Sequence, residues 1–562
     1  MKKKLLFTLM MVVMTFATMS AYDFEVDGIY YNRKGKEAIV TYKGSNYTNE
    51  ASYSGDVVIP ETVTYQGVTY PVTSINGGAF YYCNELTSIS IPNTITTIGG
   101  SAFYECRRLT DVSIPNSVTT IKANAFCWCA GLKNVELSNS IVSIDACAFA
   151  FCINLSAIEI PNSVQTIGGC AFSECHAMRD LTIGSSVSSI GNGAFDKCKS
   201  LASIVVAEDN VYFDSRENCN ALIETASNTL IRGCQNTVIP TTVTSIHYSA
   251  FSGSRGLTSI EIPNTVSIIR GSAFSYCEDL VSVALPSSIT EINGSTFEYC
   301  TSLNSIEIPD SVVSIGNSAF YECSALKDLK IGCSVSSIGR LSFEGCGELA
   351  SIEVAEGNVY YDSRENCNAI IETASNTLRR GCYSTIIPNT VTRIGESAFN
   401  KCHGLSSYTI PNSITCIEKY AFEDCLELAI ITIGESVDSI ASYAFYGCDN
   451  MRTVICKPVM PPSIDGTSFY GRYQNLLFVP NESLEAYRAH EEWGKFGTII
   501  PFIGAGPGDI NGDGVVSVGD VTSLIDLLLS GDDLPAYCDV NGDGKVSIGD
   551  VTALIDMLLS KN

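Results

Sequence analysis

The sequence predicts a long solenoid with a parallel β-sheet on one face, followed by a small all-α module. Two observations predict this fold. A leucine or methionine recurs every 23 residues over most of the chain, and one twelve-residue motif occurs twice within residues 509–562. A fixed period of about 20–50 residues is typical of solenoids, in which each repeat buries its apolar side against its neighbours.

The 23-residue period keeps its register along the chain. The repeated position is filled by Leu86, Leu109, Leu132, Leu155, Met178, Leu201, Leu257, Leu280, Leu303, Leu326, Leu349, Leu405, Leu428 and Met451. The two wider gaps, 201–257 and 349–405, are both 56 residues long, which is one period plus 33 residues. The array therefore contains two insertions of equal length.

Each unit follows the pattern L-x-x-I-x-I-P-x-x-V-x-x-I-G-x-x-A-F-x-x-C. Alternating apolar and polar side chains over residues 86–91 predict a short strand with one buried face. Pro92 ends this strand because it has no N–H to donate, and we expect Gly99 to form a turn with positive φ. The expected inward side chains of this unit are Leu86, Ile89, Ile91, Ile95, Ile98, Phe103 and Cys106. Stacking then predicts a phenylalanine column that runs from Phe80 to Phe469.

Most of the 24 cysteines belong to the repeat. Thirteen occupy the last position of the unit: Cys83, Cys106, Cys129, Cys152, Cys175, Cys198, Cys277, Cys300, Cys323, Cys346, Cys402, Cys425 and Cys448. We expect buried free thiols here, because cysteine packs as a small apolar residue and a disulfide needs specific Cβ geometry. A line of thiols also disfavours zinc, whose ligands gather around one centre. Two further pairs, Cys219 with Cys234 and Cys367 with Cys382, flank predicted hairpins, and both redox states stay open for them.

The two insertions have nearly the same sequence. Residues 210–234 read NVYFDSRENCNALIETASNTLIRGC, and residues 358–382 differ at only a few positions. The alternation on either side of Ser227 and Asn228 predicts a β-hairpin. Asp214 and Arg216 allow two interpretations, a binding site or a turn in which the aspartate accepts backbone N–H groups and the arginine is solvated. We favour the turn, because aspartate at such positions usually serves the backbone.

Composition and the first residues predict a secreted protein. Lysines at 2–4, an apolar run over 5–17, and Ser20 and Ala21 are typical of a signal peptide. No later stretch is long and apolar enough to cross a membrane. The net charge of −26 argues against nucleic acid and anionic membranes as partners.

The expected organisation places the repeats between two caps. It comprises a signal peptide (1–21), an N-terminal β cap (22–57), the solenoid (58–451) with hairpin insertions near 207–234 and 355–382, a C-terminal cap (452–503), a linker (504–508) and the α module (509–562). Caps are needed because the end of a solenoid exposes its core. Tyr487, Trp493 and Phe496 are the residues we expect to cover the last rung.

The duplicated motif, DINGDGVVSVGD at 509–520 and DVNGDGKVSIGD at 539–550, has the spacing of a calcium loop. Calcium takes six to eight oxygen ligands around one centre. The predicted ligands are Asp509, Asn511, Asp513, Val515 through its carbonyl, Ser517 through water and Asp520, then Asp539, Asn541, Asp543, Lys545 through its carbonyl, Ser547 and Asp550. The motif thus predicts two Ca²⁺ ions. One amphipathic helix is expected after each loop, and the module's ten carboxylates against two lysines predict unfolding without calcium.

The sequence gives no support for catalysis. Its four histidines have no metal-binding spacing, and the chain contains no nucleophile elbow or phosphate-binding glycine loop. Cys175 and His176 are adjacent on a turn, so their side chains cannot face each other for proton transfer. We therefore predict a non-catalytic protein.

The I-P…I-G…A-F-x-x-C unit resembles the BspA-type leucine-rich repeats of bacterial surface proteins over about residues 22–500. Thr94 stands where ordinary leucine-rich repeats have asparagine, which is the BspA-type variant. The resemblance implies a curved leucine-rich-repeat solenoid, an extracellular or cell-surface location, and adhesion to host or microbial surface proteins.

Residues 508–562 resemble a type I dockerin. That resemblance implies calcium-dependent folding, docking onto a cohesin-like domain, and two near-symmetric helices that present the same face. Loop positions 10 and 11 help select the partner in that family; here they are Val518-Gly519 and Ile548-Gly549, without the usual Ser or Thr.

Two functions remain open. The solenoid is either an adhesin or protein-recognition scaffold tethered through the dockerin to a cohesin-type partner, or a structural spacer or accessory subunit of an extracellular polysaccharide-degrading assembly. The outward strand positions are Ser90, Ser113, Glu136, Glu159, Thr182, Val205, Glu261, Ala284, Glu307, Lys330, Glu353, Thr409 and Thr432. This column is mildly acidic and poor in aromatics, which favours a basic or extended protein ligand over a sugar. Simple solvation of the strand face is an equally open interpretation.

Overall fold

The computed structural model describes residues 22–44, 53–469, 471–502, 508–510, 516–530, 538–543 and 545–559. The predicted signal peptide, most of the predicted linker, and the predicted ligands Asn511, Asp513 and Val515 lie outside the described residues. The chain forms two compact units, Met1–Val266 with Ala273–Cys277, and Ser267–Ser272 with Glu278–Asn562.

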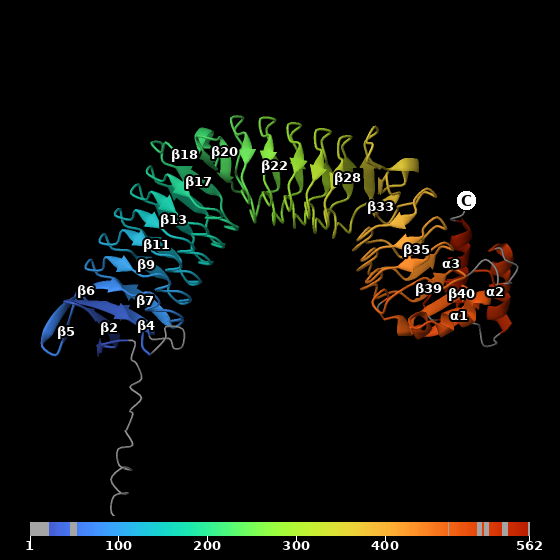
Figure 1. The fold of residues 1–562 in the computed structure, drawn as a ribbon, viewed down its shortest axis with the longest axis horizontal. Helices are drawn as coiled ribbons and strands as arrows, with labels where there is room; N and C mark the ends of the chain where they lie inside the picture. Colours follow the sequence, from blue (N-terminus) through green and yellow to red (C-terminus); the bar gives the residue numbers. More distant parts are fainter. Residues whose placement is uncertain are drawn as a thin grey trace, which may run out of the picture. The chain divides into compact units, whose positions relative to one another are not determined.

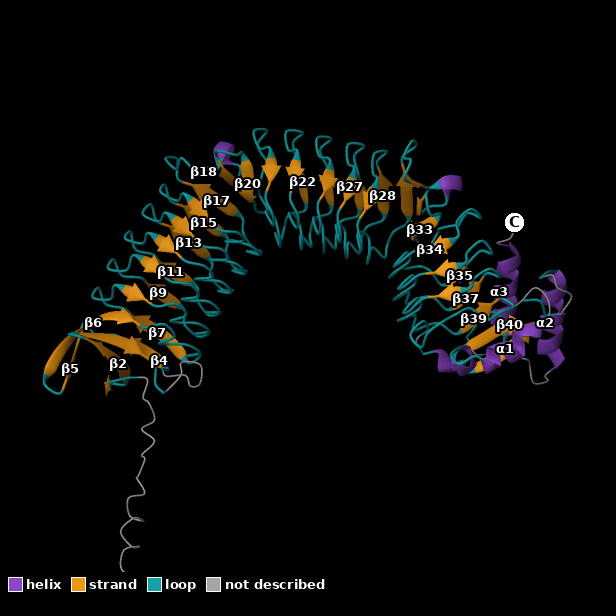
Figure 2. Ribbon diagram, viewed as in Figure 1, coloured by secondary structure: helices purple, strands orange, loops and turns teal. Residues whose placement is uncertain are grey.

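The regular rungs contribute two short strands each, and most of these strands pair in parallel with a strand of a neighbouring rung (Figure 1, Figure 2). The I-x-I segment forms the first ladder, where β9 (Asp111–Ser113) pairs with β11 (Asn134–Glu136) and Val112 lies opposite Val135. The T-I or S-I segment forms a second ladder, where β10 (Thr120–Ile121) pairs with β8 (Thr97–Ile98) and β12 (Ser143–Ile144). The sequence predicted only the first ladder, because a two-residue strand carries no alternation.

The first unit begins with an antiparallel meander and continues into both ladders. Its strands are β1 (Phe24–Val26), β2 (Ile29–Lys34), β3 (Glu37–Thr41), β4 (Gly55–Val58), β5 (Thr62–Tyr65), β6 (Val68–Ile75), β7 (Leu86–Ser90), β8 to β12, β13 (Ala157–Ile160), β14 (Thr166–Ile167), β15 (Asp180–Ile183), β16 (Ser189–Ile190), β17 (Ser203–Val206), β18 (Phe213–Asp214), β19 (Leu222–Glu224), β20 (Thr229–Arg232), β21 (Ser245–Ile246) and β22 (Ser259–Glu261). Strand β3 pairs in parallel with β6, so the meander joins the second ladder.

The second unit also contains both ladders, and its last three strands pair in parallel with one another in order. Its strands are β23 (Ile268–Ile269), β24 (Ser282–Ala284), β25 (Glu291–Ile292), β26 (Ser305–Glu307), β27 (Ser314–Ile315), β28 (Asp328–Ile331), β29 (Ser337–Ile338), β30 (Ser351–Val354), β31 (Tyr361–Asp362), β32 (Ile370–Glu372), β33 (Thr377–Arg380), β34 (Arg393–Ile394), β35 (Ser407–Thr409), β36 (Cys416–Ile417), β37 (Ile430–Ile433), β38 (Ser439–Ile440), β39 (Thr453–Cys456), β40 (Leu476–Pro480) and β41 (Thr498–Phe502). Its helices are α1 (Leu484–Ala489), α2 (Val518–Ser530) and α3 (Ile548–Leu559).

Stacked phenylalanines form the core of both units, as the repeat predicts. The rings of Phe103 and Phe126 lie 4.9 Å apart and within 4° of parallel. In the second unit Phe297 and Phe320 lie 5.3 Å apart, within 8° of parallel. These separations are close to the spacing of neighbouring strands, so the ring stack and the two ladders share one repeat distance.

The cysteine column lies inside the core as free thiols. Most thiols of the column donate to a phenylalanine carbonyl of the preceding rung, as Cys106 Sγ does to the Phe80 carbonyl at 3.0 Å, whereas Cys83 and Cys402 donate to the carbonyls of Tyr81 and His403. Burial raises the pKa of Cys198 to about 12, which keeps this thiol protonated. The hairpin cysteines Cys219 and Cys234 are also buried and free. A bulge between Leu222 and Ile223 shifts the register of the hairpin that these two cysteines flank.

Gly99 does not have the positive φ expected from the sequence. The left-handed backbone lies instead at Ser101 and Glu105, with φ of 55° and 60°. Gly99 is needed for a different reason: a Cβ atom there would lie 2.4 Å from the backbone nitrogen of Gly77 on the preceding rung. Close stacking on Gly77, and not turn geometry, therefore limits the room for a side chain at Gly99, although Lys122 and Asp145 occupy the equivalent position of the next two rungs.

The last rungs are covered by aromatic side chains. Tyr487 on α1 and Trp493 after it are fully buried, and Phe496 is nearly so. The indole N–H of Trp493 donates to the Pro462 carbonyl at 2.8 Å, and the Trp493 ring lies 5.5 Å from that of Phe469. These residues pack on the core and are not available as a surface platform for a ligand.

Candidate calcium loops and recognition surfaces

In the second loop of the α module, side-chain oxygen atoms accept hydrogen bonds from the backbone N–H groups of the loop. The backbone N–H of Asp543 donates to Asp539 Oδ1 at 3.1 Å and to Asn541 Oδ1 at 2.8 Å. The N–H of Asn541 donates to Asp550 Oδ1 at 3.0 Å, although Asp550 lies on α3. Oxygen atoms from loop positions 1, 3 and 12 are thus held around one short stretch of backbone.

The last aspartate of each loop also fixes the start of its helix. Asp520 and Asp550 each accept the backbone N–H of the serine three residues earlier, Ser517 or Ser547, at 2.7 Å. The same serine oxygens accept the N–H of Gly519 or Gly549 at 3.1 Å. This reciprocal cap explains why both helices begin directly after the serine.

The donor atoms in the second loop fit calcium, because all of them are oxygens. The Asp550 side chain is fully buried and Asp539 nearly so, and buried carboxylates require a compensating positive charge. Among the described residues, no three His, Cys, Asp or Glu side chains gather closely enough to hold a metal ion. The second loop is predicted to use amide and backbone carbonyl oxygens as well, as calcium loops do. Of the predicted ligands of the first loop, Asp509, Ser517 and Asp520 are the described ones.

The two helices pack on each other and leave matching apolar residues exposed. Leu524 and Leu554 are completely buried in the small core of the module. Three pairs of exposed residues, each 30 positions apart, remain outside it: Val518 and Ile548, Ile525 and Ile555, Leu529 and Leu559. The exposed fraction of Leu529 is 79% and that of Leu559 is 68%, so each helix offers the same apolar surface. The dockerin resemblance implied two helices with the same face, but the sequence did not single out Leu529 and Leu559.

The first ladder of the solenoid presents its outward column to solvent. All thirteen predicted outward side chains are exposed except Thr432, which is half-buried. In the first unit, a shallow depression of about 580 Å³ crosses β7, β9 and β11. Ser90, Ser113 and Glu136 line it from the strands, and Asn93 and Asn116 line it from the following turns.

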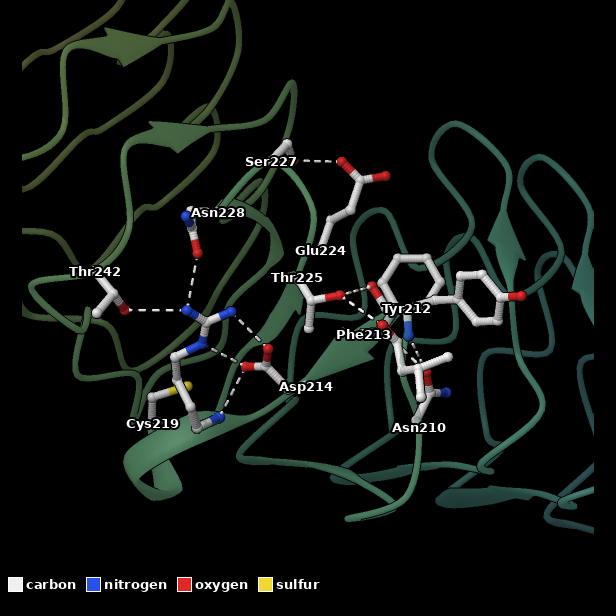
Figure 3. Close-up of polar contacts among 12 residues, drawn as sticks. Asn210, Tyr212, Phe213, Asp214, Cys219, Glu224, Thr225, Ser227, Asn228 and Thr242 are labelled. Carbon is white, nitrogen blue, oxygen red and sulfur yellow. Dashed lines mark hydrogen bonds and ion pairs between the residues drawn. The ribbon is translucent and has the colours of Figure 1, made fainter.

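In each insertion the Asp–Arg pair makes more contacts than the local turn that the sequence favoured. Figure 3 shows the polar contacts of the first insertion. Asp214 does accept the Arg216 N–H, at 3.1 Å. The Arg216 side chain, however, is not solvated: it forms two further bonds to Asp214, at 2.7 and 2.6 Å, and donates to Asn228 at 2.9 Å. Arg364 repeats these bonds in the second insertion. The pair clamps the hairpin to the strand before it, so it serves the fold.

Two of the four histidines lie beside carboxylates on the rung surface. His176 lies 2.7 Å from Glu174, and His403 lies 2.9 Å from Glu348. Within the described segments, no helix is both long and apolar enough to span a membrane.

Two family models match the chain. The model described as the BspA type leucine-rich repeat region matches residues 73–202, 119–226, 230–364 and 379–483. The model for the dockerin type I domain matches residues 507–559. No curated protein is similar enough to the chain to count as a match.

Solved structures of bacterial leucine-rich-repeat proteins are similar to the chain. A leucine-rich cell surface protein from Faecalibacterium prausnitzii is 29% identical, over 60% of this chain and 95% of that chain, with a TM-score of 0.49. A leucine-rich-repeat protein from Bacteroides ovatus is 25% identical, over 78% of this chain and 95% of that chain, with a TM-score of 0.40.

Proposed function

The chain belongs to the BspA-type leucine-rich-repeat family and carries a type I dockerin domain, and from this premise we propose a secreted, two-part binding protein. The dockerin docks onto a cohesin-type domain, and the solenoid recognises a protein surface. BspA-type repeats and dockerins occur in extracellular or cell-surface proteins, and they are generally not enzymes. The combination of a docking module with a long repeat surface in one chain is the observation that carries the proposal.

We propose that two Ca²⁺ ions bind the module, one in each loop. The ligands are Asp509, Asn511, Asp513, Val515, Ser517 and Asp520 in the first loop, and Asp539, Asn541, Asp543, Lys545, Ser547 and Asp550 in the second. Bound calcium supplies positive charge that offsets the carboxylates of each loop. The burial of Asp550 and the inward oxygens of Asp539 and Asn541 support this assignment.

The docking surface for the cohesin is the apolar face that each helix repeats. Exposed apolar residues at matching positions of α2 and α3 support it, since apolar surface on a small soluble module usually marks an interface. Because the two faces are equivalent, either helix can make the contact. Replacing Leu529 and Leu559 together by glutamate removes both faces, whereas either single change leaves one intact.

The depression across β7, β9 and β11 is the proposed recognition surface of the solenoid. Its serine and asparagine side chains recur on successive rungs, which suits the regularly spaced backbone groups of an extended peptide. Glu136 in the depression and Asp111 beside it favour a basic partner. Sugars are less suited, because stacking aromatics are absent from the residues that line it.

A two-arm pull-down with the calcium-loaded protein tests the proposal. One arm uses an immobilised type I cohesin, and the other uses immobilised extracellular matrix proteins. We expect the Leu529→Glu/Leu559→Glu double variant to lose binding to the cohesin only. The Ser113→Arg/Glu136→Arg double variant should lose binding to the matrix proteins only. Binding in the cohesin arm alone favours a structural spacer or accessory subunit of a polysaccharide-degrading assembly. Cohesin binding by the double variant would refute the proposed docking face.

A further inference from the structure

The two insertions allow a residue-by-residue comparison within one chain. A residue of the first insertion corresponds to the one 148 positions later, as Asn210 does to Asn358. Each insertion ends in a buried arginine, Arg232 or Arg380, beside the rung that follows it. We call the surroundings of Arg232 the first junction and those of Arg380 the second junction.

Both arginines are buried among neutral acceptors. Arg232 is 2% exposed and Arg380 is 3% exposed. Arg380 donates to the backbone carbonyls of Ser397, Asn400 and Cys346, the last at 2.7 Å. Its Nε atom, like that of Arg232, is buried and has no hydrogen-bond partner within the described part of the chain. A buried donor on a charged group is costly to leave unpaired, so this atom calls for an acceptor.

The second junction differs from the first in the residues around this arginine. Asn192, Ile231 and Tyr248 of the first junction are replaced by Arg340, Arg379 and Glu396 in the second. The replacements add two arginines and one glutamate, a gain of one positive charge. The same fold therefore holds a nearly neutral lining in one place and a cationic lining in the other.

A cavity of about 50 Å³ opens at the second junction. Its lining includes Arg340, Glu344, Arg379, Arg380, Glu396 and Ser397. The lining runs from the exposed Arg340 side chain, 68% accessible, to the buried Arg380. At about 10–15 Å³ for each water molecule, the cavity has room for roughly three to five waters or one carboxylate group.

The charges of the lining favour an anion. Arg340 and Glu396 neutralise each other in an ion pair at 2.7 Å. Glu344 accepts the Ser397 hydroxyl at 2.7 Å. Arg379 and Arg380 are then two positive charges against the single carboxylate of Glu344, and guanidinium groups bind carboxylates with directional N–H bonds.

We propose that the second junction binds a carboxylate anion, which accepts the Arg380 Nε–H and is drawn in by Arg379. The carboxylate comes either from a small free acid or from an acidic side chain of a partner protein. The site is separate from the calcium loops and from the depression across β7, β9 and β11, so it adds a second recognition point to the proposed function.

The test uses the full-length calcium-loaded protein and acetate as the probe. Saturation-transfer NMR of the acetate methyl group, at constant ionic strength, measures binding, and acetamide serves as the uncharged control. We expect saturable binding of acetate and none of acetamide. Arg379→Ile and Arg340→Asn are the matched variants, because the first junction already carries Ile231 and Asn192 at these positions and folds. We expect Arg379→Ile to weaken acetate binding at least tenfold.

A second measurement separates the two sources of the carboxylate. A short peptide with blocked termini and one aspartate is compared with acetate on the same protein. Binding of acetate alone identifies a small free acid, and binding of both identifies a partner side chain. No saturable acetate binding, or equal binding by Arg379→Ile, would overturn the proposal.

Discussion

Replacing Asp550 by asparagine should separate the calcium role of this residue from its structural role. The Asp550 carboxylate accepts two backbone N–H bonds, from Asn541 at 3.0 Å and Ser547 at 2.7 Å. An amide keeps one oxygen acceptor at nearly the same place but removes the negative charge. The cap of α3 should therefore persist in the variant, while the interaction with a divalent cation is weakened.

The magnitude follows from the electrostatics of a buried ligand. Two unit charges about 4 Å apart interact by about 4 kcal/mol at an effective dielectric constant of 20, and part of this is offset by desolvation. We expect a net loss of about 2–4 kcal/mol in calcium binding, which corresponds to roughly 30- to 1,000-fold weaker affinity. Without calcium, the variant should be as helical as the parent or slightly more so, because it carries one fewer repelling charge.

Calcium titration followed by circular dichroism measures both quantities on the same sample. Asp556→Asn is the matched control, since Asp556 is an exposed carboxylate on the same helix that lies outside the loop. We expect this control to change the calcium affinity by less than about threefold, because solvent screens an exposed charge. Equal calcium affinities of Asp550→Asn and Asp556→Asn would show that Asp550 is not a ligand.

Three further predictions concern the solenoid. The Ser254 hydroxyl is buried without a partner among the described residues. Ser254→Cys should therefore raise the free energy of unfolding by about 1 kcal/mol in a urea titration. A loss of stability would contradict the role assigned to the thiol column. Burial, together with Asp424 and Glu344, raises the pKa of Glu423 to about 6. The folded protein therefore binds this proton more tightly than the unfolded chain does, and the free energy of unfolding falls as the pH rises from about 4.5 to 6. Glu423→Gln should therefore melt higher than the parent at pH 7 but not at pH 4, and an equal difference at both pH values would argue against this titration. Gly99→Ala should destabilise the array by about 2 kcal/mol or more, because its Cβ would meet the backbone 2.4 Å away. Gly100→Ala, whose nearest contact would be 3.2 Å, should destabilise the array much less. Thermal melts that rank the two variants the other way would refute the close-stacking explanation.

The repeat made much of the fold predictable. Leu86, Phe103 and Cys106 recur at one spacing because every rung meets the same neighbour, so a single unit predicts the buried face of the whole array. The helices α2 and α3 were equally visible, because the apolar period follows each loop directly. A periodic sequence thus predicts well how its repeats pack on one another.

Features set by contacts between rungs were not visible. Gly99 looked like a turn residue, yet its requirement arises from the Gly77 backbone one rung away. Arg216 looked solvated, yet it reaches Asn228, twelve residues further on. The cationic lining of the second junction escaped notice because Arg340 lies 39 positions before the adjacent pair Arg379 and Arg380, and only the stacking of the rungs brings it to the same cavity. Such sites appear in the sequence only when the two insertions are aligned with each other.

The buried thiol column has a consequence for how the protein matures. The thiolate is the form that reacts with oxidants and disulfides, and an unfolded cysteine has a pKa near 8.5. The pKa of about 12 for folded Cys198 lowers its thiolate fraction by about a thousandfold or more at neutral pH. Stacking of one rung on the next therefore protects the thiols from oxidants, and in the secreted protein proposed above rung assembly competes with oxidation. A rung that folds quickly keeps its cysteine reduced, whereas a rung that folds slowly leaves its cysteine exposed to disulfide cross-linking.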